Sequence, residues 1–341
     1  MQDYNTQPAA TEQVMFHPVD LGNYHFLITG GAGFIGSHLV DYLLKHKAGK
    51  VRVLDNFSTG SIDNLLPFQS SPAFELLEGD IREPEHCKTA MQDIDFVLHQ
   101  AALGSVPRSI SDPLTTNNVN ITGFLNVITA ARDAGVKRMI YAASSSTYGD
   151  SKELPKVEDK IGKPLSPYAV TKYVNELYAD VFSRTYGFNT IGLRYFNVFG
   201  PRQNPMGAYA AVIPLFIKAA LNNETPTING DGLTSRDFTY VENVIQANMK
   251  ALFFDGLEKH EVFNIACGGQ TTLNQLWQQI AGMAGIEADV EHAAERLGDV
   301  RQSLASIDKA SAVLGYAPQI LVGEGLQQTF DWYKTNLKLN A

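Results

Sequence analysis

The sequence predicts a doubly wound α/β fold, in which helices cover both faces of a parallel sheet, with a smaller mixed α/β lobe beside it. In the first half of the chain, short apolar runs alternate with longer stretches of helical periodicity. Strands that are apolar along their whole length are typical of a parallel sheet buried on both faces. From about residue 197, prolines and glycines cluster and the alternation becomes irregular, which indicates the second lobe.

The elements of the main sheet are expected in the following order. Residues 26–28 form the first strand, and 36–46 form a helix because their apolar residues recur on one stripe. Later strands are expected at 51–55, 74–77, 96–98, 139–141 and 190–193, with a return to the sheet at 263–266. Right-handed crossovers between such strands produce the doubly wound topology.

These changes along the chain predict three regions. The main body is expected to comprise residues 25–196 and about 237–270, and the smaller lobe about 197–236 and 271–341. Residues 1–24 are expected to be an N-terminal extension, because they carry early acidic residues and lack the apolar segment of a signal peptide.

Composition limits the classes of function. The net charge of −9 argues against a nucleic-acid partner, since binding to phosphates requires a basic face. No apolar run approaches the ~20 residues that a membrane-spanning helix needs. The two cysteines, Cys87 and Cys267, offer no disulfide framework, which fits a reducing compartment. We therefore expect a cytoplasmic protein with no nucleic-acid or membrane partner.

A glycine motif, Gly30-x-x-Gly33-x-x-Gly36, lies between the first predicted strand and the first predicted helix. In this pattern the first glycine permits a tight turn, the second lets the backbone approach a pyrophosphate, and the third allows close helix packing. The helix N-terminus then meets the phosphates. A plain glycine turn is the alternative, but the strand–turn–helix context favours a Rossmann dinucleotide site that also includes Phe34 and Ile35.

A carboxylate follows at the end of the second predicted strand. Asp55 is placed to accept a hydrogen bond from the ribose 2′-hydroxyl of a dinucleotide. Its neighbour Asn56 is not an arginine, so a 2′-phosphate would be repelled. The pair therefore favours NAD over NADP as the cofactor.

A second motif supplies acid–base chemistry. Ser166 and Pro167 are favourable residues for starting a helix, which places Tyr168 and Lys172 on one helix face. A nearby ammonium and an oxidised nicotinamide would both lower the pKa of the tyrosine from its usual value of about 10. Ser144 could share the proton that Tyr168 transfers. A Tyr and a Lys four residues apart are common in helices, so the assignment depends on the whole set.

These motifs, with the runs 99–109, 144–150, 162–200 and 193–197, resemble the extended short-chain dehydrogenase/reductase family. Within that family the chain is similar to the nucleotide-sugar 4-epimerases, in particular the bacterial UDP-N-acetylglucosamine 4-epimerases of the WbpP type. The resemblance covers nearly all of the chain from about Phe26 to the C-terminus.

The resemblance implies roles for further residues and no metal. Matching arginines, here Arg236 and Arg296, hold the substrate diphosphate, and the matching aspartate, Asp299, contacts the uridine ribose. Asn197 matches a residue that contacts the substrate phosphates or sugar. The resemblance also implies cofactor contacts by Asp80, Ile81, Ala101 and Ala102, and substrate contacts by Ser105, Ser144, Ser145 and Ser146.

Ser303 matches the position that limits the size of the sugar pocket in similar epimerases. A tyrosine there restricts the pocket to unsubstituted hexoses, whereas a small residue admits a 2-N-acetyl group. The physical reason is volume, because extra atoms in a tight pocket lose several contacts at once. The resemblance therefore implies an N-acetylated sugar.

Related dehydratases carry an Asp-Glu pair, and related decarboxylases a Glu, just after the catalytic hydroxyl. This chain has Ser145, Ser146 and Thr147 there, which leaves no carboxylate for elimination. The resemblance thus implies reversible C4 epimerisation of UDP-N-acetylglucosamine and UDP-N-acetylgalactosamine through a 4-keto intermediate with bound NAD. The alternatives are a 4-epimerase of a UDP-hexuronate or UDP-N-acetylhexosaminuronate, a broad UDP-glucose/UDP-galactose 4-epimerase, a net oxidoreductase and a non-catalytic NAD-binding regulator.

Similar epimerases form dimers through a four-helix interface that includes the helix bearing the catalytic tyrosine. In this chain the apolar-rich stretches 121–131 and 174–182 could supply two helices from each subunit. We therefore expect a homodimer.

Overall fold

The computed structural model describes residues 15–206, 210–295 and 301–337. Its centre is a parallel sheet of seven strands: β1 (His25–Thr29), β2 (Lys50–Asp55), β3 (Phe74–Glu78), β4 (Phe96–His99), β5 (Arg138–Ser144), β6 (Thr190–Tyr195) and β11 (Glu261–Ile265). The strand order is β11-β6-β5-β4-β1-β2-β3, so the chain reverses its direction of travel between β1 and β4. Every predicted strand of the main sheet overlaps an observed one, and the predicted fold class is confirmed.

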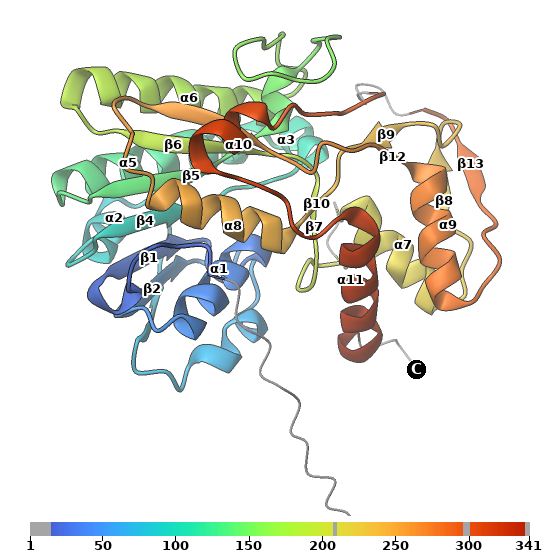
Figure 1. Ribbon diagram of the computed structural model, residues 1–341, viewed down its shortest axis with the longest axis horizontal. Coiled ribbons are helices and arrows are strands. Elements are labelled where there is room, and N and C mark those ends of the chain that lie inside the picture. Colours follow the sequence, from blue (N-terminus) through green and yellow to red (C-terminus); the bar gives the residue numbers. More distant parts are fainter. Residues whose placement is uncertain (1–14, 207–209, 296–300, 338–341) are drawn as a thin grey trace, which may run out of the picture.

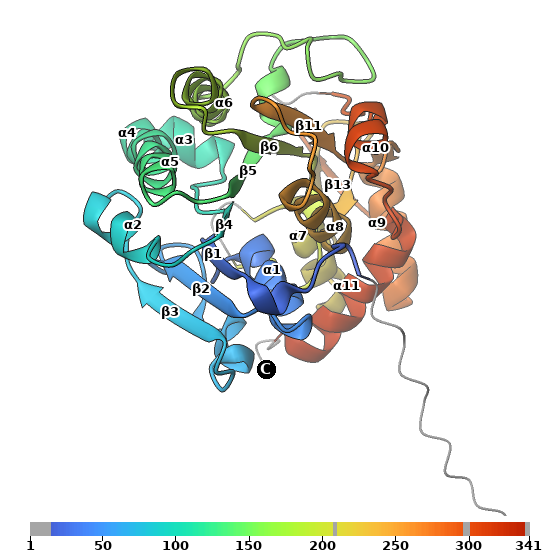
Figure 2. The same cartoon turned by 60° about the vertical axis from the view of Figure 1, so that its left-hand side comes forward.

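Helices cover both faces of this sheet, as Figures 1 and 2 show. α1 (Phe34–Lys45) and α8 (Val241–Leu252) lie on one face, and α2 (Pro84–Ala90), α5 (Phe124–Asp133) and α6 (Pro167–Tyr186) lie on the other.

Strand β1 shows why the strands are apolar along their whole length. Phe26 and Ile28 belong to the core cluster that includes α1 and α8. Leu27 belongs to the cluster that includes α2, α5 and α6. Each side of the strand therefore faces a buried layer.

The first predicted helix, 36–46, is confirmed as α1. The helix expected to begin at Pro167 is α6, and the Ser166 side chain caps it by accepting a hydrogen bond from the Ala169 amide. The stretch 174–182 lies within α6, and the stretch 121–131 runs from a π-helical segment, Asn118–Gly123, into α5. Two short helices, α3 (Val106–Ser111) and α4 (Pro113–Asn117), precede that segment.

A third core cluster lies beyond the carboxyl ends of the strands, and Phe216, Trp277 and Phe330 are among its buried rings. Its helices α7, α9 and α11 stand together in Figure 1. The short strands pair as β7 with β10, β9 with β12 and β8 with β13. The bounds of these elements are β7 (Val198–Phe199), α7 (Val212–Leu221), β8 (Thr227–Asn229), β9 (Ser235–Arg236), β10 (Thr239–Tyr240), β12 (Thr271–Thr272), α9 (Leu273–Ala284), β13 (Glu291–Ala293) and α11 (Val322–Asn336).

The helix α10 (Asp308–Leu314) lies apart from that group. Its Leu314 and the following Tyr316 are buried in the cluster of the main sheet, with α8 and β11. This stretch therefore belongs to the core of the main body, although the expected division assigned 271–341 to the smaller lobe. The division into lobes itself stays a prediction.

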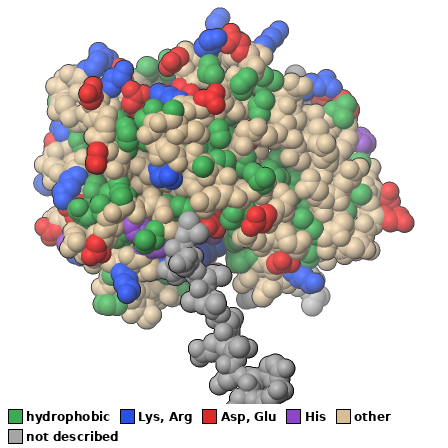
Figure 3. All heavy atoms as spheres, viewed as in Figure 1, with side chains coloured by type: hydrophobic (Ala, Val, Ile, Leu, Met, Phe, Trp, Pro, Cys, Tyr) green, Lys and Arg blue, Asp and Glu red, His purple; other side chains and the backbone are tan. Residues whose placement is uncertain are grey.

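No helix in the described part of the chain is long and apolar enough to cross a membrane. On the face drawn in Figure 3, basic and acidic side chains are interspersed. Both cysteines are free thiols, and Cys87 is buried.

Candidate active site

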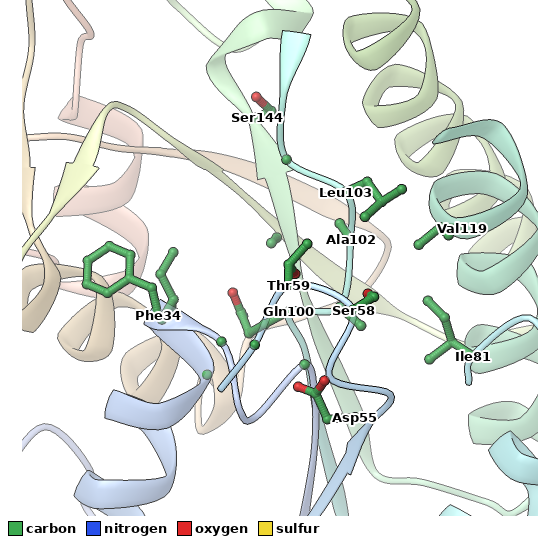
Figure 4. A pocket seen from close by; sticks show the side chains of 18 of the residues that line it. Phe34, Asp55, Ser58, Thr59, Ile81, Gln100, Ala102, Leu103, Val119 and Ser144 are labelled. Atoms are coloured by element: carbon green, nitrogen blue, oxygen red, sulfur yellow. The ribbon is translucent and has the colours of Figure 1, made fainter. Parts of the chain in front are cut away.

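A cleft of about 590 Å³ opens at the carboxyl ends of the central strands, around the point where the strand order reverses. Figure 4 shows Asp55 and Ser144 at opposite ends of the labelled residues, with Phe34 on one side and Ile81 and Val119 on the other. The cleft is lined by every residue predicted to bind the cofactor: Gly30, Gly33, Phe34, Ile35, Gly36, Asp55, Asn56, Asp80, Ile81, Ala101, Ala102, Tyr168 and Lys172.

The glycines of the turn permit close packing of the backbone at one wall of this cleft. Gly30 has a φ of +72°, and a Cβ there would lie 2.7 Å from the Ala101 amide nitrogen. A Cβ on Gly36 would overlap the Gly30 carbonyl oxygen, so the first turn of α1 sits directly on the glycine turn. Gly33 is the N-cap of α1 and offers no side-chain cap, which leaves the first amides of the helix available to an anion. These features fit a dinucleotide pyrophosphate.

Asp55 is held by the backbone beside this turn. One carboxylate oxygen accepts a hydrogen bond from the Ala32 amide and the other from the Phe57 amide, each at 2.9 Å. Burial raises the pKa of Asp55, and these amides oppose the shift. The fixed orientation suits a carboxylate that accepts a further hydrogen bond from a ribose hydroxyl.

Asn56 has protein partners for both ends of its amide. Its Nδ2 donates to Asp80 Oδ2 at 2.9 Å, and its Oδ1 accepts from the Ser58 amide at 3.1 Å. Asp80 also pairs with Arg82 at 2.5 Å, and hydrogen bonds from Arg82 lower the pKa of Asp80 to about 2. Asn56 therefore orients Asp80 at the rim of the cleft.

Tyr168, on the first turn of α6, faces the cleft from the opposite end. Burial raises the pKa of Tyr168, and a hydrogen bond with Ser144 opposes that rise. Burial is therefore the largest influence of the protein on this pKa. Lys172 Nζ donates to the Ala142 carbonyl at 2.8 Å.

Lys172 is buried one turn after Tyr168. Burial lowers the pKa of Lys172 to about 8, and Glu176 acts in the opposite direction. A buried amine with such a pKa can change charge near neutral pH.

The serines 144–146 all line the cleft at the end of β5, but they are not equivalent. The Ser144 hydroxyl accepts hydrogen bonds from the Ser146 amide at 3.2 Å and from the Ser146 hydroxyl at 2.9 Å. Ser146 therefore orients Ser144.

Sequence reasoning missed a polar contact behind this group. Asn120, in the π-helical segment, accepts from the Leu103 amide at 2.8 Å and donates to the Leu103 carbonyl at 3.2 Å. It also donates to Thr171 at 3.1 Å, and Thr171 donates to the Tyr168 carbonyl at 2.8 Å. Asn120 thus links the loop after β4 to the helix that carries Tyr168. Most of the neighbouring residues, 115–122, are polar as well, so no pattern in the sequence singled out Asn120.

A second cavity of about 650 Å³ adjoins the cleft, and Asn197, Val198 and Gln203 line both. Arg236 lines the second cavity with residues of α7 and β8. Gln203 is another missed residue, and its buried Oε1 has no hydrogen-bond partner among the described residues. Asn197 donates to the Asp237 carbonyl at 2.9 Å.

The remaining predicted substrate residues lie elsewhere. The Ser105 hydroxyl accepts from the Arg108 amide at 3.2 Å and caps α3, and Ser105 lines neither cavity. Ser303 also lines neither, but its amide donates to the carbonyl of Ser235, the residue before Arg236, at 3.1 Å. Arg296 and Asp299 lie outside the described residues.

Comparison with known proteins identifies the family. The model of the NAD dependent epimerase/dehydratase family matches residues 26–266. The chain belongs to this family. The predicted cofactor, NAD, is confirmed by this assignment, and the residues of the cleft fit it.

Several members of the epimerase/dehydratase family are similar over nearly the whole chain. A putative UDP-glucose 4-epimerase of Methanocaldococcus jannaschii is 37% identical over 312 residues, which are 91% of this chain and 98% of that protein. The structure of a UDP-N-acetylglucosamine 4-epimerase from Methanobrevibacter ruminantium M1, in complex with UDP-N-acetylmuramic acid, has a TM-score of 0.87 and 38% identity, and the match covers 92% of this chain and 99% of that one. The Thermus thermophilus UDP-glucose 4-epimerase in complex with NAD has a TM-score of 0.83 and 34% identity, over 92% of this chain and 100% of that one.

These relatives support the coarser functional prediction, an NAD-dependent UDP-sugar epimerase. The N-acetylated substrate, the homodimer and the individual roles of the site residues stay predictions.

Proposed function

We propose that this epimerase/dehydratase family member interconverts UDP-N-acetylglucosamine and UDP-N-acetylgalactosamine by epimerisation at C4, through a 4-keto sugar. The supporting observation is that the cleft with Ser144, Tyr168 and Lys172 adjoins a second cavity at Asn197 and Gln203. A sugar at this junction can face Tyr168 while its nucleoside diphosphate lies in the second cavity beside Arg236.

Three residues of the cleft have separate roles in the proton transfer. Tyr168 accepts the proton of the sugar O4 during oxidation and returns it during reduction, and Ser144 shares that proton. The Lys172 ammonium stabilises the phenolate form of Tyr168 by its positive charge. NAD, when bound, supplies the hydride acceptor and donor at C4.

The glycine turn and the residues at the rim of the cleft, among them Asp80, hold the cofactor. The first amides of α1 bind the pyrophosphate, and Asp55 accepts from the adenosine ribose. Asp80 and Ile81 lie at the adenine end of the cleft. The other cofactor contacts we propose are Gly30, Gly33, Phe34, Ile35, Gly36, Asn56, Ala101 and Ala102.

The preference for epimerisation over elimination rests on the residues that follow Ser144. The Ser146 hydroxyl donates a hydrogen bond to Ser144, and Thr147 is buried. Neither side chain is a carboxylate. Proton abstraction from carbon or expulsion of water needs a base that these side chains do not supply.

The preference for an acetylated sugar rests on Ser303. The Ser303 amide donates to the Ser235 carbonyl, and the preceding residue, Gln302, also pairs with Ser235. Ser303 therefore lies beside the strand β9 that carries Arg236. By the resemblance to similar epimerases, a serine at this position leaves room in the sugar pocket for a 2-N-acetyl group, whereas a tyrosine would fill it. Arg296 and Asp299 are proposed to complete the diphosphate and ribose contacts, and Ser105, Ser145 and Asn197 to contact the substrate.

We also propose a cytoplasmic homodimer. On α6, Val170, Leu177 and Val181 are 46%, 48% and 42% exposed, and their spacing puts them on one helix face. Leu114 of α4 is 77% exposed, and α4 lies close to α6 in Figure 2. Apolar residues gathered on one face of a helix favour association with a second copy.

The deciding experiment is incubation of the purified protein with NAD and single UDP-sugars, with products identified by NMR. UDP-N-acetylglucosamine and UDP-N-acetylgalactosamine should each yield a mixture of the two, without accumulation of free NADH. The Tyr168→Phe variant serves as the control for contaminating activity. Turnover of UDP-glucose or UDP-glucuronate alone would refute the acetylated substrate, and release of NADH would point to net oxidation.

A further inference from the structure

An ion pair lies on the side of Lys172 away from the cleft. Glu176 follows Lys172 by one turn of α6, and its carboxylate binds the Arg194 guanidinium of β6 through two hydrogen bonds of 2.9 and 2.8 Å. Both side chains are buried, with exposures of 7% and 4%. α6 packs along the strands β5 and β6, as Figure 1 shows. Neither residue lines the cleft or the second cavity.

Within the part of the chain that the structure describes, few charged or titratable groups surround Lys172. On α6 these are Tyr168 and Glu176, and on β6 Arg194. From β4, burial and the nearby Lys172 lower the pKa of His99 to about 3, so this ring is neutral. From β5, burial raises the pKa of Tyr141 well above its usual value, so it is neutral as well.

Among the described residues, Lys172 donates to one acceptor, the Ala142 carbonyl, and Glu176 is the anion that acts on it. The buried ammonium is costly unless a negative charge compensates it. No carboxylate within the described residues forms a direct ion pair with Lys172, so the compensation comes from Glu176 across one helical turn.

We propose that Glu176 is a positioning residue that acts through Lys172, and that the Glu176–Arg194 pair sets how firmly Lys172 holds its proton. This inference rests on the proposed function, in which the Lys172 ammonium stabilises the Tyr168 phenolate. The pair thereby sets the alkaline limit of the reaction.

Arg194 weakens the electrostatic effect of Glu176 on Lys172. It neutralises much of the Glu176 charge, and it also donates to the Glu158 carbonyl at 2.9 Å and lies over the Tyr148 ring at 4.9 Å. Without Arg194, the full charge of Glu176 would act on Lys172. Without Glu176, the buried Arg194 charge would be uncompensated and would favour deprotonation of Lys172.

The test compares Glu176→Gln, Arg194→Met and a matched control, Asp180→Asn, which removes a half-exposed acid from the same helix. The first readout is the pH dependence of kcat for UDP-sugar epimerisation. The second is an NMR titration of protein labelled at lysine Cε, with the Lys172 signal assigned from Lys172→Met. The second readout does not depend on turnover.

We expect Glu176→Gln to move the alkaline limb and the Lys172 titration to lower pH, by about one pH unit, which is the scale of a neighbouring charge. Arg194→Met should move both to higher pH, and Asp180→Asn should move neither. A purely structural role predicts no such opposite shifts. Unchanged titration in Glu176→Gln, or shifts of the same sign in both variants, would overturn the proposal.

A variant that leaves a buried charge unpaired can fail to fold. The double variant Glu176→Gln with Arg194→Gln keeps a hydrogen-bonded pair without either charge, and circular dichroism reports its folding. It should shift the Lys172 titration downwards by less than Glu176→Gln, and an unchanged titration would again overturn the proposal. If the wild type does not epimerise any UDP-sugar, the proposed function fails, while the NMR titration still decides the role of Glu176.

Discussion

The Ser146 hydroxyl donates a hydrogen bond to the Ser144 hydroxyl across 2.9 Å. Because Ser144 also accepts from the Ser146 amide, its own proton is directed elsewhere, and Tyr168 is the hydrogen-bonding neighbour that remains. A hydrogen bond donated by Ser144 to Tyr168 favours the phenolate form of Tyr168, which is the form that can accept a proton from the sugar.

Replacement of Ser146 by alanine should therefore weaken catalysis without abolishing it. We expect kcat to fall about fivefold, the factor that corresponds to the net worth of one hydrogen bond of about 1 kcal/mol. Ser146→Thr keeps a hydroxyl and should retain most of the activity. Equal losses in the two variants, measured by steady-state kinetics, would mean that crowding rather than the hydrogen bond matters.

Tyr168→Phe removes the proposed proton-transfer group while keeping the ring. The loss of general acid–base catalysis should lower kcat by about 10²–10⁴-fold. Substrate affinity, measured by calorimetry with the UDP-sugar, should change much less. Normal turnover of this variant would show that another group transfers the proton.

Asp55 should make the protein prefer NAD to NADP. Its carboxylate, fixed by the Ala32 and Phe57 amides, repels a 2′-phosphate. Asp55→Ala combined with Asn56→Arg should shift the preference towards NADP, as measured by competitive binding of the two dinucleotides. Because Asn56 also binds Asp80, Asn56→Ala alone is the control for damage at the rim. Equal binding of both dinucleotides by the wild type would contradict the assignment.

Ser303→Tyr should fill the space proposed for the N-acetyl group. The activation free energy for UDP-N-acetylglucosamine should rise by more than the ~1–3 kcal/mol typical of overpacking if the pocket cannot relax, so activity on this substrate should fall sharply. Activity on UDP-glucose should survive or rise. The ratio of the two kcat/KM values cancels general damage to the fold. An unchanged ratio would remove Ser303 from the specificity argument.

Leu177→Glu should disrupt the proposed dimer, because it places a charge on the exposed apolar face of α6. Light scattering at micromolar concentration should report a dimer for the wild type and a monomer for the variant. Leu321→Glu is the matched control, since Leu321 is 60% exposed at the start of α11. A monomeric wild type would rule out the homodimer at this concentration.

Local patterns in the chain were sufficient for the strands, the glycine turn and the start of α6. A strand buried on both faces is apolar residue after residue, and Ser166 with Pro167 starts a helix through contacts within one turn. Asp55 could likewise be placed from its position at the end of a strand.

The tertiary structure alone decided which polar groups meet. Asn120 reaches Leu103 and Thr171, Glu176 reaches Arg194, and Gln203 lies between the two cavities. No periodicity marks such pairs, because their partners come from other elements of the fold. The same holds for Lys172, whose ammonium donates to the Ala142 carbonyl of the neighbouring strand β5. Spacing along a helix shows which side chains share a face, but the sheet beneath that face determines where a buried ammonium finds its acceptor.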